Sequence, residues 1–172
     1  YEDILARFPK NKKATDGIKV ISGGPSGTAS KSKEPSHEQL QLLISLYTQG
    51  RHQRALDKAV EMLKPFPKSP VLHNLCGGVH AGLGNFDAAI ESYKQAIKIA
   101  PDFSEAYNNM GSALRSKGEL DVAIDNYKKA IEIKQDCAEV YYNMGIALGD
   151  KRDLDAAIDS YKQAIKIKPD YA

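Results

Sequence analysis

A 16-residue segment, Asp87–Asp102 (DAAIESYKQAIKIAPD), returns at Asp155–Asp170 with only two changes. The shift is 68 residues, which is twice 34, and a looser copy lies halfway between, at Asp121–Asp136. Self-similarity at a fixed 34-residue period is typical of stacked supersecondary units, each of which contacts only its neighbours. The period therefore predicts a repeat stack, and the first function to look for in such a stack is a surface rather than a catalytic centre.

A proline near the end of each unit sets the register of the repeats. With the proline at slot 32 of 34, Pro67, Pro101 and Pro169 occupy that slot, and Gln135 replaces it once. Proline discourages continuation of a helix and marks the turn into the next unit. Four repeats follow, over residues 36–69, 70–103, 104–137 and 138–171.

Each repeat carries two helical patterns. Slots 4, 7, 8 and 11 share one side of a helix, and slots 20, 24, 27 and 28 do so on a second. Small residues such as Gly111 (slot 8) and Ala123 (slot 20) suit a close approach of two backbones, and leucine at either is expected to cost about 1–3 kcal/mol. Between the patterns, Gly84 suits a left-handed residue after a helix, and Asn85 and Asp153 suit N-caps. The prediction is all-α, with eight antiparallel helices in four hairpins and no strand.

The residue types at the packing slots recur from repeat to repeat, and on them residues 36–172 resemble the tetratricopeptide repeat family. The resemblance implies a right-handed superhelical solenoid of helix-turn-helix hairpins. The first repeat departs most, with Gln39 at slot 4, Leu43 at slot 8 and Ala59 at slot 24. The matching residues are Gly77, Gly111 and Gly145; Ala55, Ala89, Ala123 and Ala157; Tyr93, Tyr127 and Tyr161; and Ala96, Ala130 and Ala164.

The first 35 residues break the 34-residue register. Tyr1–Lys10 aligns with Ala59–Lys68, so we expect residues 1–21 to be partial upstream repeat helices. Residues 22–35 are rich in Gly, Ser and Pro, a composition that favours a flexible linker. The chain opens without methionine and stops at a repeat boundary, which indicates a piece of a longer protein.

Charge and hydropathy argue against two classes of partner. The 24 Lys and Arg nearly balance the 22 Asp and Glu, which disfavours nucleic acid and anionic membranes. No apolar run approaches the roughly 20 residues that span a bilayer, and no signal peptide opens the chain. Cys76 and Cys137 suit a reducing compartment. We therefore expect no nucleic acid, no membrane and a cytoplasmic location.

Candidate chemistry is weak. Ser22–Ser32 contains Gly, Ser, Thr and Lys, but it lacks the spacing of a phosphate-binding loop. His73, Cys76 and His80 share one helix face and could hold zinc, but they occupy slots 4, 7 and 11, so helix packing accounts for them and no fourth ligand is evident. No nucleophile has a base beside it. The sequence therefore predicts no catalytic residue, no metal and no cofactor, and a protein that is not an enzyme.

The first helix of each repeat is expected to line the concave wall, through slots 2, 5, 6, 9, 12 and 13. This wall is apolar in repeats one and two, and it carries amides and charges in repeats three and four. An alternative is that residues 1–21 fold back or dock on a neighbouring chain and cover the apolar part. The predicted partner-binding residues are Leu40, Ile44, Tyr47, Asn74, Glu105, Asn108, Asn109, Ser112, Arg115, Tyr142, Asn143 and Asp150.

Asn109 and Asn143 share slot 6, where Gln41 and Leu75 stand in the first two repeats. Because an asparagine amide both donates and accepts hydrogen bonds, a ladder of them can hold a peptide backbone. The pair resembles the asparagine ladder in the repeat arm of the O-linked N-acetylglucosamine transferases, which implies binding of an extended peptide. A carboxylate clamp of the chaperone type needs clustered basic residues, and Arg115 is nearly alone.

Three functions remain open. The first is a non-catalytic scaffold that binds a peptide or protein in the concave groove. The second is the substrate-recruiting arm of a larger glycosyltransferase or sulfotransferase. The third is a self-assembly module, a homo-oligomer formed through the open ends of the stack or the N-terminal segment.

Overall fold

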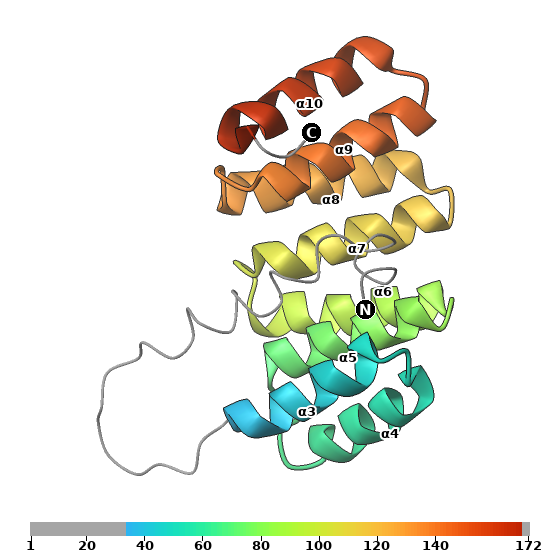
Figure 1. Ribbon diagram of the computed structural model, residues 1–172, viewed down its shortest axis with the longest axis vertical. Coiled ribbons are helices and arrows are strands. Elements are labelled where there is room, and N and C mark those ends of the chain that lie inside the picture. Colours follow the sequence, from blue (N-terminus) through green and yellow to red (C-terminus); the bar gives the residue numbers. More distant parts are fainter. Residues whose placement is uncertain (1–33, 170–172) are drawn as a thin grey trace, which may run out of the picture.

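The computed structural model describes residues 34–169, and these form eight α-helices and no strand (Figure 1). This confirms the predicted all-α class. The predicted upstream helices, 1–21, and the predicted linker, 22–35, up to residue 33, lie outside the described residues. The helices pair into four antiparallel hairpins: α3 (His37–Thr48) with α4 (His52–Leu63), α5 (Pro70–Gly82) with α6 (Phe86–Ile99), α7 (Ser104–Ser116) with α8 (Leu120–Ile133), and α9 (Ala138–Asp150) with α10 (Leu154–Ile167).

Local signals set several helix starts. At α3 the Ser36 side chain accepts from the Gln39 backbone N–H while the Gln39 side chain accepts from the Ser36 N–H, a reciprocal capping box. Ser69 caps α5 and Pro70 is its first residue. Asp153 accepts from the Ala156 N–H at 3.4 Å, as an N-cap should.

The turn inside each hairpin contains one residue with positive φ. Gly50, Gly84 and Gly118 take this conformation at φ of 71°, 78° and 82°. In the last hairpin Arg152 takes it at 67° without the help of glycine. Asn85 takes the predicted N-cap position at the start of α6, but its side chain makes no cap hydrogen bond there.

The hairpins stack in chain order, from α3 and α4 at one end to α9 and α10 at the other (Figure 1). Each second helix packs on the first helix of the next hairpin. First helices also touch one another, α3 with α5, α5 with α7 and α7 with α9, more extensively than the second helices do. The first helices therefore form the tighter, inner row of the stack, which is the row predicted to line the concave wall.

Within three hairpins a glycine of the first helix receives a tyrosine of the second. A Cβ added at Gly77, Gly111 or Gly145 would lie 2.5, 2.8 or 2.6 Å from a ring carbon of Tyr93, Tyr127 or Tyr161. Contacts this short do not occur, so only glycine lets the ring lie against the backbone. The predicted placement of slots 8 and 20 between helices is confirmed, because Gly111, Ala123, Gly145 and Ala157 are all buried.

The first hairpin reverses the sizes. Leu43 stands where the other repeats have glycine, and Ala59 stands where they have tyrosine. Both are buried, with 1% and 0% of their surface exposed. The large side chain thus comes from α3 and the small one from α4, so the interface is filled from the opposite side.

Ion pairs connect neighbouring turns in the second half of the stack. Lys117 lies 2.7 Å from Asp87 of the preceding repeat, and Lys151 binds Asp121 in the same way. The first junction has no such pair, because the corresponding residues are Gln53 and Leu83.

Candidate partner-binding face

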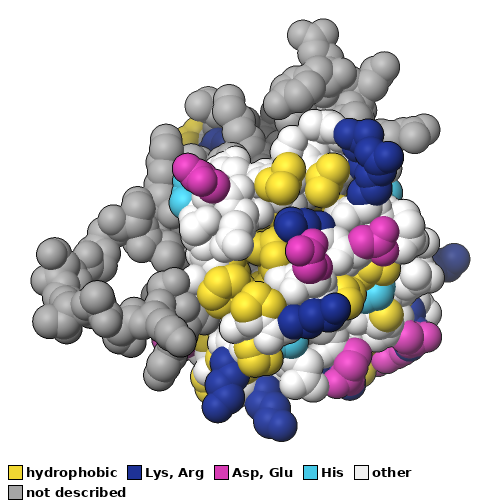
Figure 2. Space-filling view, turned by 90° about the horizontal axis from the view of Figure 1, so that it is seen from below, with side chains coloured by type: hydrophobic (Ala, Val, Ile, Leu, Met, Phe, Trp, Pro, Cys, Tyr) yellow, Lys and Arg dark blue, Asp and Glu magenta, His cyan; other side chains and the backbone are white. Residues whose placement is uncertain are grey.

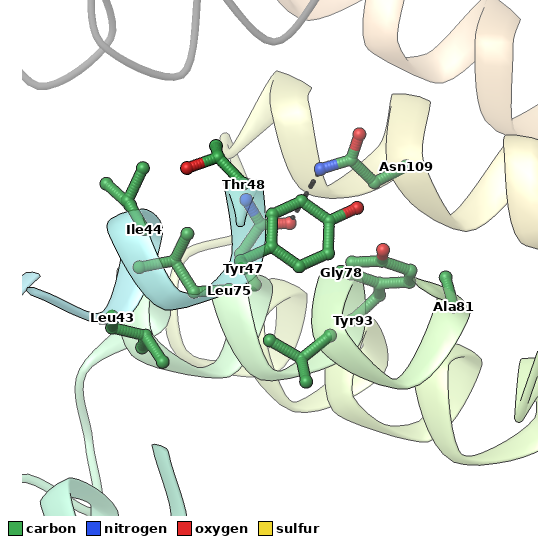
Figure 3. A pocket seen from close by; sticks show the side chains of 11 residues that line it. Leu43, Ile44, Tyr47, Thr48, Leu75, Gly78, Ala81, Tyr93 and Asn109 are labelled. Carbon is green, nitrogen blue, oxygen red and sulfur yellow. Dashed lines mark hydrogen bonds between the residues drawn. The ribbon is translucent and has the colours of Figure 1, made fainter. Parts of the chain in front are cut away.

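The inner row of helices contains a pocket of about 170 Å³ between α3, α5 and α7 (Figure 3). Aliphatic side chains, the ring of Tyr47 and the ring of Tyr93 form most of its wall, and Asn74 and Asn109 stand at one side. No lining residue carries a charge. The lining residues are Leu43, Ile44, Tyr47, Thr48, Asn74, Leu75, Gly78, Val79, Ala81, Tyr93 and Asn109.

Tyr93 places its hydroxyl in this wall. Its side chain is only 3% exposed, and its hydroxyl has no hydrogen bond to any residue within 34–169. Burial, with a smaller contribution from the Tyr47 phenol, raises the pKa of Tyr93 well above its usual range. The phenol is therefore neutral and can donate its proton at any ordinary pH.

The equivalent hydroxyl in the next repeat does have a partner. Tyr127 Oη lies 3.2 Å from Ser112 Oγ, and Ser112 occupies slot 9 of its repeat. In the second repeat slot 9 is Gly78. A Cβ added there would be 3.9 Å from Tyr93 Oη, its nearest neighbour, so the space beside the hydroxyl is open. The pocket thus exists in part because a glycine replaces this serine.

Two asparagine pairs, one in the pocket wall and one further along the stack, connect neighbouring first helices. Asn109 Nδ2 donates to Asn74 Oδ1, and Asn143 Nδ2 donates to Asn108 Oδ1, each at 3.0 Å. In both pairs a slot-6 amide reaches back to a slot-5 amide of the preceding repeat. Part of the hydrogen-bonding capacity that we assigned to a partner's backbone is therefore used within the stack.

One ion pair lies further along the same wall. Arg115 Nη1 is 3.0 Å from Asp150 Oδ2, and both side chains are partly exposed. The pair neutralises the groove's most prominent cation, so this part of the face is polar but carries little net charge. It offers no cluster of basic residues for an acidic tail.

The structure brings four of the predicted binding residues together in the pocket: Ile44, Tyr47, Asn74 and Asn109. Two others are buried within the stack. Leu40 belongs to the apolar core. It stands at slot 5, and Leu75 stands at slot 6 of the next repeat, the two positions that the asparagine pairs occupy further along the stack. Asn108 is 7% exposed, because its carbonyl faces Asn143 across the helix junction. The other residues lie along α7 and α9, on the polar part of the wall: Glu105, Ser112, Arg115, Tyr142, Asn143 and Asp150.

The list of predicted binding residues leaves out seven residues that line the pocket: Leu43, Thr48, Leu75, Gly78, Val79, Ala81 and Tyr93. Slot 24 was assigned wholly to helix packing, although the hydroxyl of Tyr93, the slot-24 residue of the second repeat, reaches the groove. The signal was present in the sequence as the difference between Gly78 and Ser112 at slot 9, since only one of these can satisfy the tyrosine behind it.

The packing interpretation of Cys76 is confirmed. It is buried in the first apolar cluster, and burial raises its pKa. His73 bonds to the Pro67 carbonyl at 3.0 Å rather than pointing to a shared centre with Cys76, and burial lowers the pKa of His80. Within the described part of the chain no group of three or more His, Cys, Asp or Glu is arranged to hold a metal ion.

The outer surface is mixed in character. Seen from the α3–α4 end, basic, acidic and hydrophobic side chains alternate without a broad patch of one charge (Figure 2). None of the helices within 34–169 has the length and hydropathy required to cross a bilayer.

A stack of helical hairpins with a lined inner face defines the class of repeat scaffolds that bind other proteins. The chain belongs to the tetratricopeptide repeat family. Family models described as "TPR repeat" match residues 77–114 and 111–151, and one described as "Tetratricopeptide repeat" matches 138–171, so together they cover more than half of the chain.

Solved structures share this fold. The crystal structure of MamA aligns with a TM-score of 0.70 and 24% identity over 92% of this chain and 94% of that one. MamA 41-end from Desulfovibrio magneticus RS-1 aligns with a TM-score of 0.70 and 20% identity over 82% and 79%. TTC0263, a thermophilic TPR protein in Thermus thermophilus, aligns with a TM-score of 0.69 and 24% identity over 77% and 74%. No curated protein matches the chain.

Proposed function

We propose that this chain is a non-catalytic scaffold that binds an extended segment of a partner protein along α3, α5, α7 and α9. The observation that carries the proposal is the division of one continuous face into an uncharged pocket and a polar strip of paired amides. Apolar pockets supply affinity, and amides beside them hold and orient a peptide backbone.

The amides retain capacity for a partner. An asparagine side chain has two N–H groups and a carbonyl with two lone pairs. The bond to Asn74 uses one donor of Asn109, which leaves its carbonyl to accept from a backbone N–H. Asn109 also lines the pocket, so a segment bound there would place its backbone beside this amide.

The test is a binding measurement on groove variants. Asn109→Ala should weaken the affinity for a captured partner by about 3- to 10-fold, the loss of one or two neutral hydrogen bonds. Lys128→Ala is the matched control, because Lys128 is exposed on α8, away from this face. Calorimetry would give the affinities, and circular dichroism should show equal helix content. Equal affinity for Asn109→Ala and the wild type would remove the support for this face.

A second candidate is self-assembly, and it depends on the outer face of α10. Leu154, Ile158 and Ile165 are 64%, 50% and 46% exposed, whereas Ile90 and Ile124, the equivalents of Ile158, are buried beneath the next hairpin. The occupant we favour is α3 of a second copy, because Leu42 at slot 7 is also half exposed, while Cys76 and Met110 at that slot are buried. Such head-to-tail contacts build filaments or rings.

Light scattering over a concentration series tests the assembly. The Ile158→Lys variant should contain less oligomer and more monomer than the wild type at the same concentration. Val122→Lys is the control, because Val122 is a 49% exposed apolar residue on α8, away from the end of the stack. A wild-type chain that stays monomeric at high concentration would end this candidate.

A further inference from the structure

The uncharged pocket at α3, α5 and α7 has a feature that peptide-backbone binding does not use. Tyr93 is more than nine-tenths buried, and its hydroxyl stands in the pocket wall with no hydrogen-bond partner within residues 34–169. Among the described residues the fully buried side-chain atoms without a partner are His52 Nδ1 and His80 Nδ1, so the Tyr93 hydroxyl is open to the pocket and can bond to an occupant. Tyr127 shows the paired arrangement, with Ser112.

The volume of the pocket limits the occupant. Its 170 Å³ is close to that of engineered apolar cavities of about 150 Å³, which take up benzene. One six-membered ring therefore fits it. The surrounding Leu43, Ile44 and Val79 supply aliphatic contact. Tyr47 adds an aromatic ring to the wall (Figure 3).

The charge of the pocket limits it further. No lysine, arginine, aspartate or glutamate lines the wall, so a charged side chain would lose its water without gaining an ion pair. The occupant is a neutral ring. Because the Tyr93 phenol can exchange a hydrogen bond with an occupant, a ring with a hydroxyl group is favoured over one without.

We infer that this pocket is a side-chain site that takes a tyrosine of the partner segment, whose phenol exchanges a hydrogen bond with Tyr93. The inference rests on the proposed function, since it names the side chain that the groove reads. Asn109, at the rim, then holds the backbone of the same segment. Specificity comes from Gly78, since a serine there would fill the space and satisfy Tyr93 from within the chain.

The first experiment uses side-chain fragments on the full 172-residue chain. Amide shifts are followed by nuclear magnetic resonance during titration with p-cresol, the tyrosine side chain, and toluene, the phenylalanine side chain. We expect saturable shifts at Gly78 and Ala81 with p-cresol, and binding of toluene about 3- to 10-fold weaker, the value of one neutral hydrogen bond. Tyr93→Phe should bring the two affinities together.

The decisive variant is Gly78→Ser, which copies the third repeat. It should abolish the p-cresol shifts. Gly149→Ser is the control, because Gly149 is also a helical glycine with open space around it and lies on α9. Undiminished p-cresol binding by Gly78→Ser, equal binding of toluene, or no saturable shift at Gly78 would each overturn the inference.

Failure of this inference is separable from failure of the proposed function. A partner whose affinity falls in Asn109→Ala but is unchanged in Gly78→Ser would show that the groove binds and that the tyrosine site is wrong. Loss of partner affinity in both variants, with p-cresol bound by the wild type, supports both.

Discussion

The first and third hairpins fill the same interface with opposite side chains. In the first, Leu43 on α3 faces Ala59 on α4, and in the third, Gly111 on α7 faces Tyr127 on α8. All four are buried. The difference shows that the side chains at these two positions must together fill a fixed volume between the helices. The large side chain can come from either helix.

The polar contacts between hairpins differ in the same direction. The second half of the stack has paired asparagines on the inner face and Lys–Asp pairs at the turns. The first junction has Leu40 and Leu75 at the amide positions and no ion pair at the turn. One half is thus held mainly by apolar packing, and the other adds polar contacts that fix the register of its helices.

The largest expected effect comes from removing the side chain that fills the first hairpin. Leu43→Gly should lower the free energy of unfolding by about 3–5 kcal/mol, because it leaves a cavity opposite Ala59. Adding Ala59→Tyr should restore part of this loss, with a coupling of about 1–3 kcal/mol. Urea unfolding of the four proteins in the cycle gives the values. Additive losses would show that the two positions do not share one volume.

Alanine substitutions at two adjacent glycines of α5 should change the stability in opposite directions, which tests the same packing argument. Gly77→Ala should cost about 1–3 kcal/mol, because its Cβ would lie 2.5 Å from the Tyr93 ring. Gly78→Ala should stabilise by about 0.5–1 kcal/mol, because the space is open and alanine favours a helix. Both are measured by the midpoint of urea unfolding. The same sign for both changes would contradict the packing argument.

A third test replaces the asparagine pair between α7 and α9 by the apolar pair found at the first junction. Asn143→Ala should cost about 1–3 kcal/mol, because it leaves the buried carbonyl of Asn108 without its partner. Replacing both asparagines by leucine copies the Leu40 and Leu75 arrangement and should recover most of the loss, since removing both polar groups is nearly neutral. A double variant less stable than Asn143→Ala would show that the amide pair has no apolar substitute at this junction.

The repeat period and small-residue slots were enough to predict the class of fold and the hairpins. They could not show that Leu43 and Ala59 exchange roles, since a size swap is visible only when the two positions are known to face each other. Leu40 and Asn108 were placed on the open face because the periodicity of one helix shows only which of its residues share a face. Both residues are buried by the neighbouring first helix, and that contact between repeats cannot be read from the pattern of a single helix. Tyr93 was missed because it belongs to the core and to the pocket at once.

The smallest effect belongs to the ion pairs at the turns. Hydrogen bonds that the Lys117 ammonium donates to Asp87 and, with a smaller effect, to Glu119 raise the pKa of Lys117. A folded-state pKa above the unfolded value of 10.5 means that the contribution is complete below pH 10.5 and declines as pH rises through the folded pKa. Lys117→Met should therefore destabilise the chain slightly at pH 7 in low salt, and hardly at all in 1 M NaCl.

The first junction allows the same pair to be built rather than broken. Gln53→Asp with Leu83→Lys places an aspartate and a lysine at the positions of Asp87 and Lys117. This double variant should gain at low salt about what Lys117→Met loses, and both differences should shrink together above pH 10.5. Comparing each variant with its parent at one pH removes the shared effect of the buried tyrosines, whose pKa values are also raised. A Lys117→Met loss that persists undiminished in 1 M NaCl would contradict a contribution from the exposed ion pairs with Asp87 and Glu119.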